Sequence, residues 1–97
     1  MTRDDIIAEL LRHRTELEAE GVAHLYLFGS FARGDNGPTS DVDLFFDPGK
    51  ADFSILDYAG IVETAKDILR FKADLHHRGS LRPRVRARAE ADAVRVF

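Results

Sequence analysis

Hydrophobic residues recur along this chain at two spacings, one typical of helices and the other typical of strands. Thr2 and Asp5 have the spacing of a capping box, and apolar residues at helical intervals follow as far as Gly21, namely Ile6, Ile7, Leu10, Leu11 and Leu17. Residues 22–28 are then a mainly apolar run that ends at Gly29. The pattern predicts an N-terminal helix, followed by a strand that is buried on both faces at the centre of a sheet.

Two further elements follow the loop at residues 34–40, which is rich in Gly, Asn, Pro, Thr and Ser. Residues 41–47 largely alternate aspartate with hydrophobic side chains, which predicts a second strand with one polar face. Ser54 and Asp57 indicate another helix cap, and the apolar positions of residues 55–69 follow the spacing of a helix. A strand and then a helix are therefore expected here.

The last third of the chain predicts three short elements. Residues 72–77 are expected to form a third strand, Pro83 to open an arginine-rich helix, and residues 93–97 to close the chain as an edge strand. With a short helix beginning at Ser30, the order of elements is α-β-α-β-α-β-α-β. We therefore expect one α/β domain over residues 1–97, with a small mixed sheet flanked by helices.

The composition narrows the classes of chemistry that this domain can support. The 97 residues include 14 Lys and Arg, 17 Asp and Glu, and no cysteine, so disulfide scaffolds, thiolate zinc sites and cysteine nucleophiles are excluded. The longest stretch without Asp, Glu, Lys or Arg, from Gly21 to Ala32, is shorter than a membrane helix needs, and the N-terminus lacks the pattern of a signal peptide. We expect a cytoplasmic protein whose chemistry uses its one core or is completed by a partner.

Asp41 and Asp43 are the first candidates for a chemical site. Residues two apart on a strand share a face, so these carboxylates stand side by side and, at about 5 Å in an effective dielectric near 20, repel each other by about 3 kcal/mol. A divalent cation bound by oxygen ligands would relieve the repulsion. The solvated face of an ordinary strand explains such a pair as well, and Asp47 on the same face is expected to form local hydrogen bonds at the Pro-Gly turn.

Gly29 and Ser30 change this interpretation, because they directly follow the predicted buried strand. Gly29 lets the backbone turn sharply, and a helix that begins at Ser30 would offer free N–H groups and a hydroxyl to an anion. A phosphate there, with carboxylates for Mg²⁺ ten residues later on a neighbouring strand, has the parts of phosphoryl or nucleotidyl transfer. The Walker and dinucleotide-binding patterns are both absent from the sequence.

This pair of motifs resembles a known family signature. Gly29-Ser30, ten further residues, and the Asp-Val-Asp of residues 41–43 match the G-S-x10-D-x-D pattern of the nucleotidyltransferase superfamily related to DNA polymerase β. The longer strings at residues 28–34 and 40–44 are similar to its small MNT, or minimal nucleotidyltransferase, branch. The resemblance covers nearly the whole chain and implies the nucleotidyltransferase fold.

The resemblance implies a site for ATP and two Mg²⁺ ions, in which the β- and γ-phosphates rest on Gly29 and Ser30. It also implies three metal-binding catalytic carboxylates, which are Asp41, Asp43 and Asp74. Asp74 enters only through the family, because Ala73-Asp74-Leu75 matches the position of its third carboxylate. An acceptor hydroxyl, deprotonated with help from a metal and an aspartate, would attack the α-phosphorus and expel pyrophosphate.

Other charged residues leave alternatives open. Arg33 is predicted to bind the nucleotide or the acceptor, or else to pair with Asp35. His76 and His77 are adjacent on a strand and face opposite sides, so they are not expected to share a metal ion. Residues 70–97 hold 8 basic and 3 acidic side chains, and their arginine-rich helix is open to three interpretations: a solvated face, a protein-binding surface, or a contact with a nucleotide or nucleic acid.

The resemblance implies an antitoxin that transfers AMP from ATP to a tyrosine of a partner HEPN-type ribonuclease toxin and so silences it. A chain with a nucleotide site but no second domain for a small substrate or tRNA fits a protein acceptor. Two alternatives are a binding module that neutralises its partner by contact, and nucleotidyl transfer to a small molecule or a nucleic-acid end. Neither a membrane nor a nucleic-acid partner is expected, and both homo-oligomers and hetero-oligomers stay open.

Overall fold

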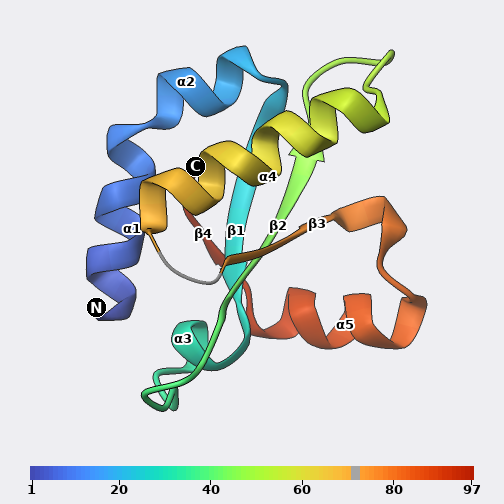
Figure 1. Cartoon of the computed structure of the whole chain (residues 1–97). Helices are drawn as coiled ribbons and strands as arrows, with labels where there is room; N and C mark the ends of the chain where they lie inside the picture. The colour runs from blue at the N-terminus through green and yellow to red at the C-terminus, as the bar shows by residue number, and fades with distance from the viewer. Residues whose placement is uncertain (71–72) are drawn as a thin grey trace.

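Four strands form one mixed sheet in the order β3-β2-β1-β4 (Figure 1). The computed structural model describes residues 1–70 and 73–97. Strand β1 (Val22–Phe28) pairs antiparallel with β2 (Val42–Pro48) and β4 (Val94–Arg95), whereas β2 pairs parallel with β3 (Ala73–His77). The mixed sheet expected from the sequence is confirmed, and β1 is one of its two inner strands.

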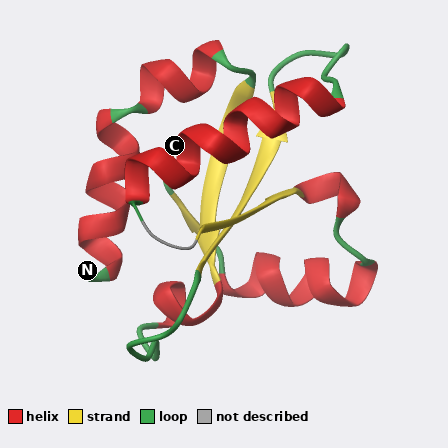
Figure 2. Ribbon diagram, in the orientation of Figure 1, coloured by secondary structure: helices red, strands yellow, loops and turns green. Residues whose placement is uncertain are grey.

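Three helices cover one face of the sheet (Figure 2). They are α1 (Arg3–Arg12), α2 (Arg14–Ala19) and α4 (Ile55–Leu69). Leu10 and Ile61 from these helices pack with strand residues such as Leu27 and Leu44 in the main hydrophobic core, where all four are fully buried. Within the described ranges, no helix is long and apolar enough to cross a membrane.

On the opposite face of the sheet, an arginine side chain covers two aromatic rings. Arg78 belongs to a short 3-10 helix, η1 (Arg78–Ser80), and its guanidinium lies 4.7 Å from the ring centre of Tyr26 and 4.9 Å from that of Phe45. Ion pairs of 2.9 Å with Asp47 and 3.1 Å with Glu90 hold Arg78 over the rings. This cation–π and ion-pair cluster takes the place of a second hydrophobic layer.

The arginine cover corrects two expectations. β1 was expected to be buried on both faces with Tyr26 in the core, but Tyr26 is half-buried, because its neighbour on that face is Arg78 and not a helix. Asp47 was expected to form hydrogen bonds within its own turn, but it pairs with Arg78 instead. The next helix, α5 (Pro83–Asp92), lies beside this cluster and supplies Glu90 to it.

The N-terminal helix, expected as one element, is broken at His13. The φ of −107° and ψ of 17° at His13 leave the helical region, so α1 ends before it and α2 begins after it. The His13 ring Nδ1 lies 3.0 Å from the backbone oxygen of Glu9. With this break Leu17 is buried in the core, whereas Leu11, expected on the buried face, is largely exposed.

The remaining elements lie close to their predicted bounds. Both capping boxes are present, at Thr2–Asp5 and Ser54–Asp57. Strand β4 has only two residues, although Val96 and Phe97 beyond it are buried and continue hydrogen bonding to β1. Lys72, the expected first residue of the third strand, lies outside the described residues.

Candidate functional site

The parallel register of β2 and β3 places two of the predicted carboxylates side by side. Asp43 of β2 is the register partner of Asp74 of β3, so both side chains leave the sheet on the same face. Asp41 precedes β2 by one residue, is exposed, and acts electrostatically on Asp43. Asp41 and Asp74 are 33 positions apart in the sequence, and in the structure both lie near Asp43 at one edge of the sheet.

The charge around Asp43 fits a hard cation. Burial, and then the negative charges of Asp74 and Asp41, raise the pKa of the Asp43 carboxyl, and His76 and Arg33 offset only part of this rise. All three acids offer oxygen atoms, the ligands that Mg²⁺ takes. In the described ranges no three His, Cys, Asp or Glu side chains are already grouped around one point as metal ligands. The donor chemistry therefore fits Mg²⁺, and the side chains would have to close around it.

His76 is a neighbour of the acids that the sequence did not indicate. Its Nε2 lies 3.3 Å from the Asp74 carboxylate, and its ring centre lies 6.1 Å from that of Phe28. His77 points to the opposite face, where its ring contacts Phe46 and Phe53. The prediction that the two histidines do not share an ion is therefore consistent with their placement on opposite faces.

Helix α3 (Gly29–Arg33) begins directly after β1 and brings its first residues against the acids. Gly29 has a φ of +75°, and a Cβ on this residue would overlap Oδ2 of Asp43. Only glycine therefore fits between the strand and the carboxylate. Phe28 is the N-cap of α3 and forms no side-chain cap hydrogen bond, and the Ser30 hydroxyl belongs to this first turn of the helix.

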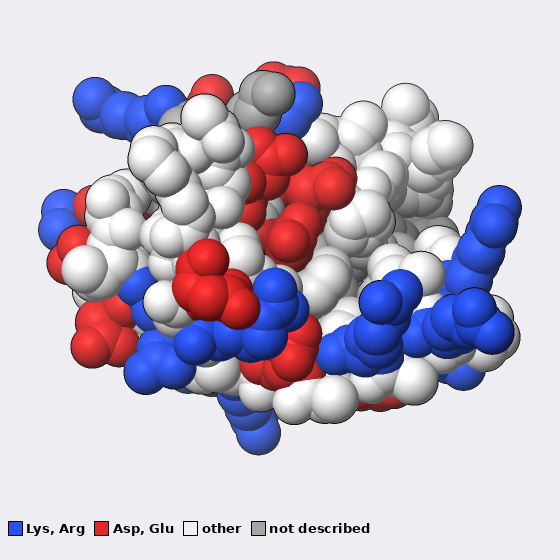
Figure 3. Space-filling view, turned by 90° about the horizontal axis from the view of Figure 1, so that it is seen from below, with Lys and Arg blue, Asp and Glu red and all other residues white. Residues whose placement is uncertain are grey.

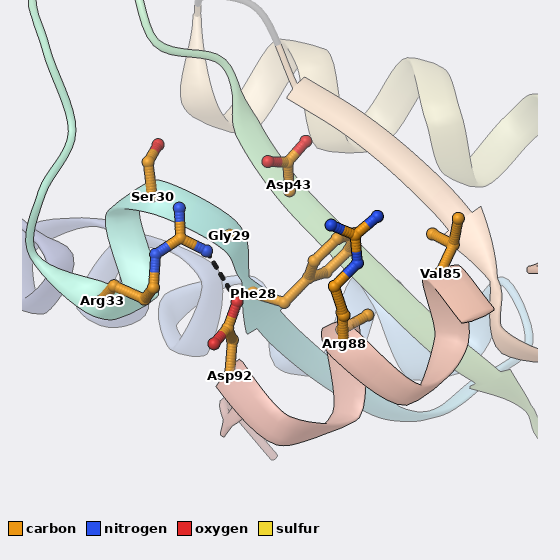
Figure 4. A pocket seen from close by; sticks show the side chains of 9 residues that line it. Phe28, Gly29, Ser30, Arg33, Asp43, Val85, Arg88 and Asp92 are labelled. Carbon is orange, nitrogen blue, oxygen red and sulfur yellow. Dashed lines mark hydrogen bonds and ion pairs between the residues drawn. The ribbon is translucent and has the colours of Figure 1, made fainter.

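A cleft of about 320 Å³ opens between α3 and α5. Gly29, Ser30 and Asp43 line one part of it, and α5 contributes Val85 and Arg88 (Figure 4). Asp41 and Asp74 are not among the residues that line this cleft. The α5 residues were missed as site residues, and the only signal for them was the run of alternating arginines, which left a nucleotide contact as one interpretation.

Arg33 of α3 forms an ion pair with α5, on the other side of the cleft. Its guanidinium forms ion pairs of 3.1 Å with Asp35 and 2.6 Å with Asp92 of α5, the second drawn as a dashed line in Figure 4. These hydrogen-bonded carboxylates raise the pKa of Arg33. The pairing with Asp35 that the sequence left open is present, and the role of Arg33 in nucleotide binding stays a prediction.

Comparisons with known proteins show which family model and which relatives this chain matches. The family model described as "Nucleotidyltransferase domain" matches residues 7–96. A curated relative from Thermococcus cleftensis, named "Protein adenylyltransferase MntA", is 32% identical over 83 residues, which are 84% of this chain and 83% of the relative. The match thus extends over most of both chains.

Two solved structures share the fold. One, described as a candidate minimal nucleotidyltransferase, superposes with a TM-score of 0.82 at 24% identity and covers 97% of this chain and 95% of its own. The other, titled "Crystal structure of the toxin-antitoxin with AMP-PNP", has a TM-score of 0.70 at 16% identity, with 89% and 71% of the two chains covered. Because both structures are less than 25% identical to this chain, they show that the fold is shared.

Proposed function

This chain belongs to the nucleotidyltransferase domain family, and from this membership we propose that it transfers AMP from ATP to a hydroxyl group of a partner protein. The observation that carries the proposal is the register pair Asp43–Asp74 beside the Gly29–Ser30 start of α3. In this proposal the carboxylates hold a metal and the Gly29–Ser30 end of α3 holds a phosphate, the two parts that nucleotidyl transfer requires. The relative named as a protein adenylyltransferase supports a protein acceptor.

The proposed metal ligands are the three acids at the sheet edge, Asp41, Asp43 and Asp74. Bound Mg²⁺, with two ions implied by the family, would neutralise charge on the phosphates and lower the pKa of the acceptor hydroxyl. Burial, and then repulsion by Asp74 and Asp41, raise the pKa of Asp43, and this supports the assignment, because a bound cation would favour the charged carboxylate. The family's use of a nucleoside triphosphate is the reason to place ATP here.

The chain's own groups are proposed to bind and orient the triphosphate. The N–H groups of Gly29 and Ser30 and the Ser30 hydroxyl donate hydrogen bonds to phosphate oxygens. Gly29 keeps this backbone close to Asp43, and Arg33 contributes a positive charge from the same helix. In the reaction a bond forms between the acceptor oxygen and the α-phosphorus, the bond to pyrophosphate breaks, and one aspartate takes the hydroxyl proton.

The proposed acceptor is a tyrosine of a HEPN-type ribonuclease toxin, which makes this chain an antitoxin. The MNT resemblance supports this partner, and so does the shared fold with a protein titled as a toxin-antitoxin complex with AMP-PNP. A protein acceptor would bring its own surface to the open cleft between α3 and α5. Because ATP is the proposed AMP donor, the cytoplasm is the proposed location.

The proposal is tested by mixing the full chain with ATP that is labelled in its AMP part, Mg²⁺ and a HEPN-type toxin protein. We expect label on a toxin tyrosine, and no label when that tyrosine is changed to phenylalanine. The double variant Asp41→Asn/Asp43→Asn should transfer no label and should fail to neutralise the toxin in cells. Neutralisation by this variant would show a contact-only antitoxin, and label on a small molecule or nucleic-acid end without the partner would show the other alternative.

A further inference from the structure

Helix α5 and its N-cap carry four arginines whose charges have no partner in the described part of the chain. These residues, called the α5 arginines below, are Arg82, Arg84, Arg86 and Arg88. None of their guanidinium groups forms an ion pair or hydrogen bond with another described residue. Of the other arginines, Arg3, Arg12, Arg14, Arg33 and Arg78 form ion pairs, whereas Arg70 and Arg95 form none with the described residues, and only on α5 do several such unpaired arginines share one element.

The acidic residues of α5 cannot neutralise these arginines, because they are already engaged elsewhere. Glu90 pairs with Arg78 at 3.1 Å, and Asp92 pairs with Arg33 at 2.6 Å. Both contacts lead away from α5, one to η1 and the other to α3. The helix therefore presents uncompensated positive charge to its surroundings.

The position of the charges opposes the stability of the helix. Arg82 is the N-cap and Arg84 and Arg86 follow in the first two turns, where the helix macrodipole is positive. The first turn contains no acidic residue, and Arg82 makes no side-chain cap. A helix selected for stability alone would have Asp or Glu at these positions. Charges that disfavour their own helix and lack partners indicate a surface that an anionic group completes.

The surroundings of the α5 arginines favour a protein over a nucleic acid. Val85 lies among them, is 41% exposed, and also lines the cleft. Arginine next to an exposed apolar side chain is typical of protein interfaces, and residues 81–92 contain no aromatic side chain on which a base could stack. Figure 3 shows basic side chains gathered beside acidic ones on one face of the molecule.

We infer that the α5 arginines bind an acidic segment of the acceptor protein next to the hydroxyl that receives AMP. The inference rests on the proposed function, because it describes how that acceptor is recognised. Val85 and Arg88 belong to both the cleft and α5, so an acidic segment seated on α5 lies directly beside Ser30 and Asp43. Acidic residues that flank the acceptor tyrosine would therefore select the substrate.

The test uses the full chain with two synthetic acceptors of opposite charge, a random Glu–Tyr copolymer and a random Lys–Tyr copolymer. Copolymer binding is measured by fluorescence anisotropy, and AMP transfer by label from ATP in the presence of Mg²⁺. The variant Arg84→Glu/Arg86→Glu changes only residues outside the cleft lining, and glutamate in these turns favours the helix dipole. The matched control, Arg12→Glu/Lys66→Glu, makes the same change in net charge on the helices of the other face.

We expect the Glu–Tyr copolymer to bind more tightly than the Lys–Tyr copolymer, and its affinity to fall about tenfold in Arg84→Glu/Arg86→Glu but not in the control variant. Equal affinity for both copolymers, or equal loss in both variants, would overturn the inference. So would tighter binding of polyuridylate than of the Glu–Tyr copolymer, because the surface would then belong to a nucleic acid. Charge-dependent binding without AMP transfer leaves the docking surface intact and counts against the proposed function alone.

Discussion

Gly29 lies so close to Asp43 that residue 29 has no room for a side chain. A Cβ there would overlap Oδ2 of Asp43 and lie 3.2 Å from its Cγ. Gly29 also has a φ of +75°, in the left-handed region that favours glycine. The glycine of one motif and the first β2 aspartate of the other are therefore in contact, and the geometry of each depends on the other.

The first prediction separates this contact from simple backbone strain. Gly29→Ala should lower the free energy of unfolding by about 1–2 kcal/mol and should also abolish AMP transfer, because the new methyl group displaces the Asp43 carboxylate. Gly34→Ala is the matched control, since Gly34 has a φ of +83° but no atom within 4 Å of its Cβ position. It should lose about 1 kcal/mol of stability and keep transfer. Equal activity of the two variants would contradict a role for the contact.

The second prediction compares two aspartates on the same face of β2. Asp43→Asn should lower AMP transfer more than about a hundredfold and yet raise the melting temperature by about 2–4 °C, because it removes a charge that burial and the neighbouring acids disfavour. Asp47→Asn should destabilise the fold by about 1–2 kcal/mol, because it weakens the partly buried pair with Arg78, and should leave transfer nearly unchanged. Thermal unfolding and label transfer measure both effects. A destabilised Asp43→Asn would contradict the conclusion that the charge of Asp43 disfavours the folded state.

The third prediction concerns the pH dependence of stability. The folded-state pKa of Asp43 is raised above its ordinary value of 3.8, so ionisation of Asp43 disfavours the folded state. Relative to Asp43→Asn, the wild type should lose stability as the pH rises from 3.8 to the raised pKa, and the difference should then stay constant. Urea unfolding in the absence of Mg²⁺, at steps from about pH 3 to about pH 7, measures this difference.

The stability contributed by Asp57 should depend on pH in the opposite direction, so Asp57 serves as an internal comparison. Its pKa is lowered from 3.8, mainly by the hydrogen bond that its carboxylate accepts from the Ser54 backbone. The stabilisation by Asp57 is therefore present above its ordinary pKa and is lost as the pH falls through the lowered value. Asp57→Asn should be less stable than the wild type at neutral pH, and this difference should shrink in acid. The same sign of pH dependence for both residues would contradict the assignment.

The fourth prediction concerns Arg33. Arg33→Ala should raise the KM for ATP about tenfold while changing the free energy of unfolding by less than about 1 kcal/mol, because its ion pairs are exposed. Asp92→Asn removes the pair with α5 but leaves the guanidinium free for a phosphate. It should therefore not raise the KM. If Arg33 served only to tie α3 to α5, both variants would have the same effect.

The elements that sequence reasoning placed well are those with strong local signals. The run at residues 22–28 lies between two glycines, and the observed β1 has the same bounds as the prediction. Ser54–Asp57 likewise marks the start of α4 as a capping box. The break at His13 was not predicted, because no glycine or proline marks it and the helical spacing continues across it.

The parts of the site that were missed depend on contacts between distant residues. The pair of Arg33 with Asp92 joins positions 59 apart, and that of Arg78 with Asp47 joins positions 31 apart. No local sequence pattern predicts that Asp92 pairs with Arg33 of α3 or that Glu90 pairs with Arg78 of η1. The two-part motif identified Gly29, Ser30, Asp41 and Asp43, whereas the side of the cleft that α5 forms follows from packing of α5 against α3 and β1.

The parallel pairing of Asp43 with Asp74 also has a consequence for the order of folding. Parallel neighbours need a long crossover, which here runs through α4 before β3 can take its place at the edge of the sheet. A growing chain that ends before β3 contains the glycine–serine turn and both acids near β2, but it lacks the third carboxylate. The segment that joins β1 to β2 is shorter than the one that joins β2 to β3, so we expect β1 and β2 to pair first. The acid cluster is then expected to be complete only after β3 has joined the sheet.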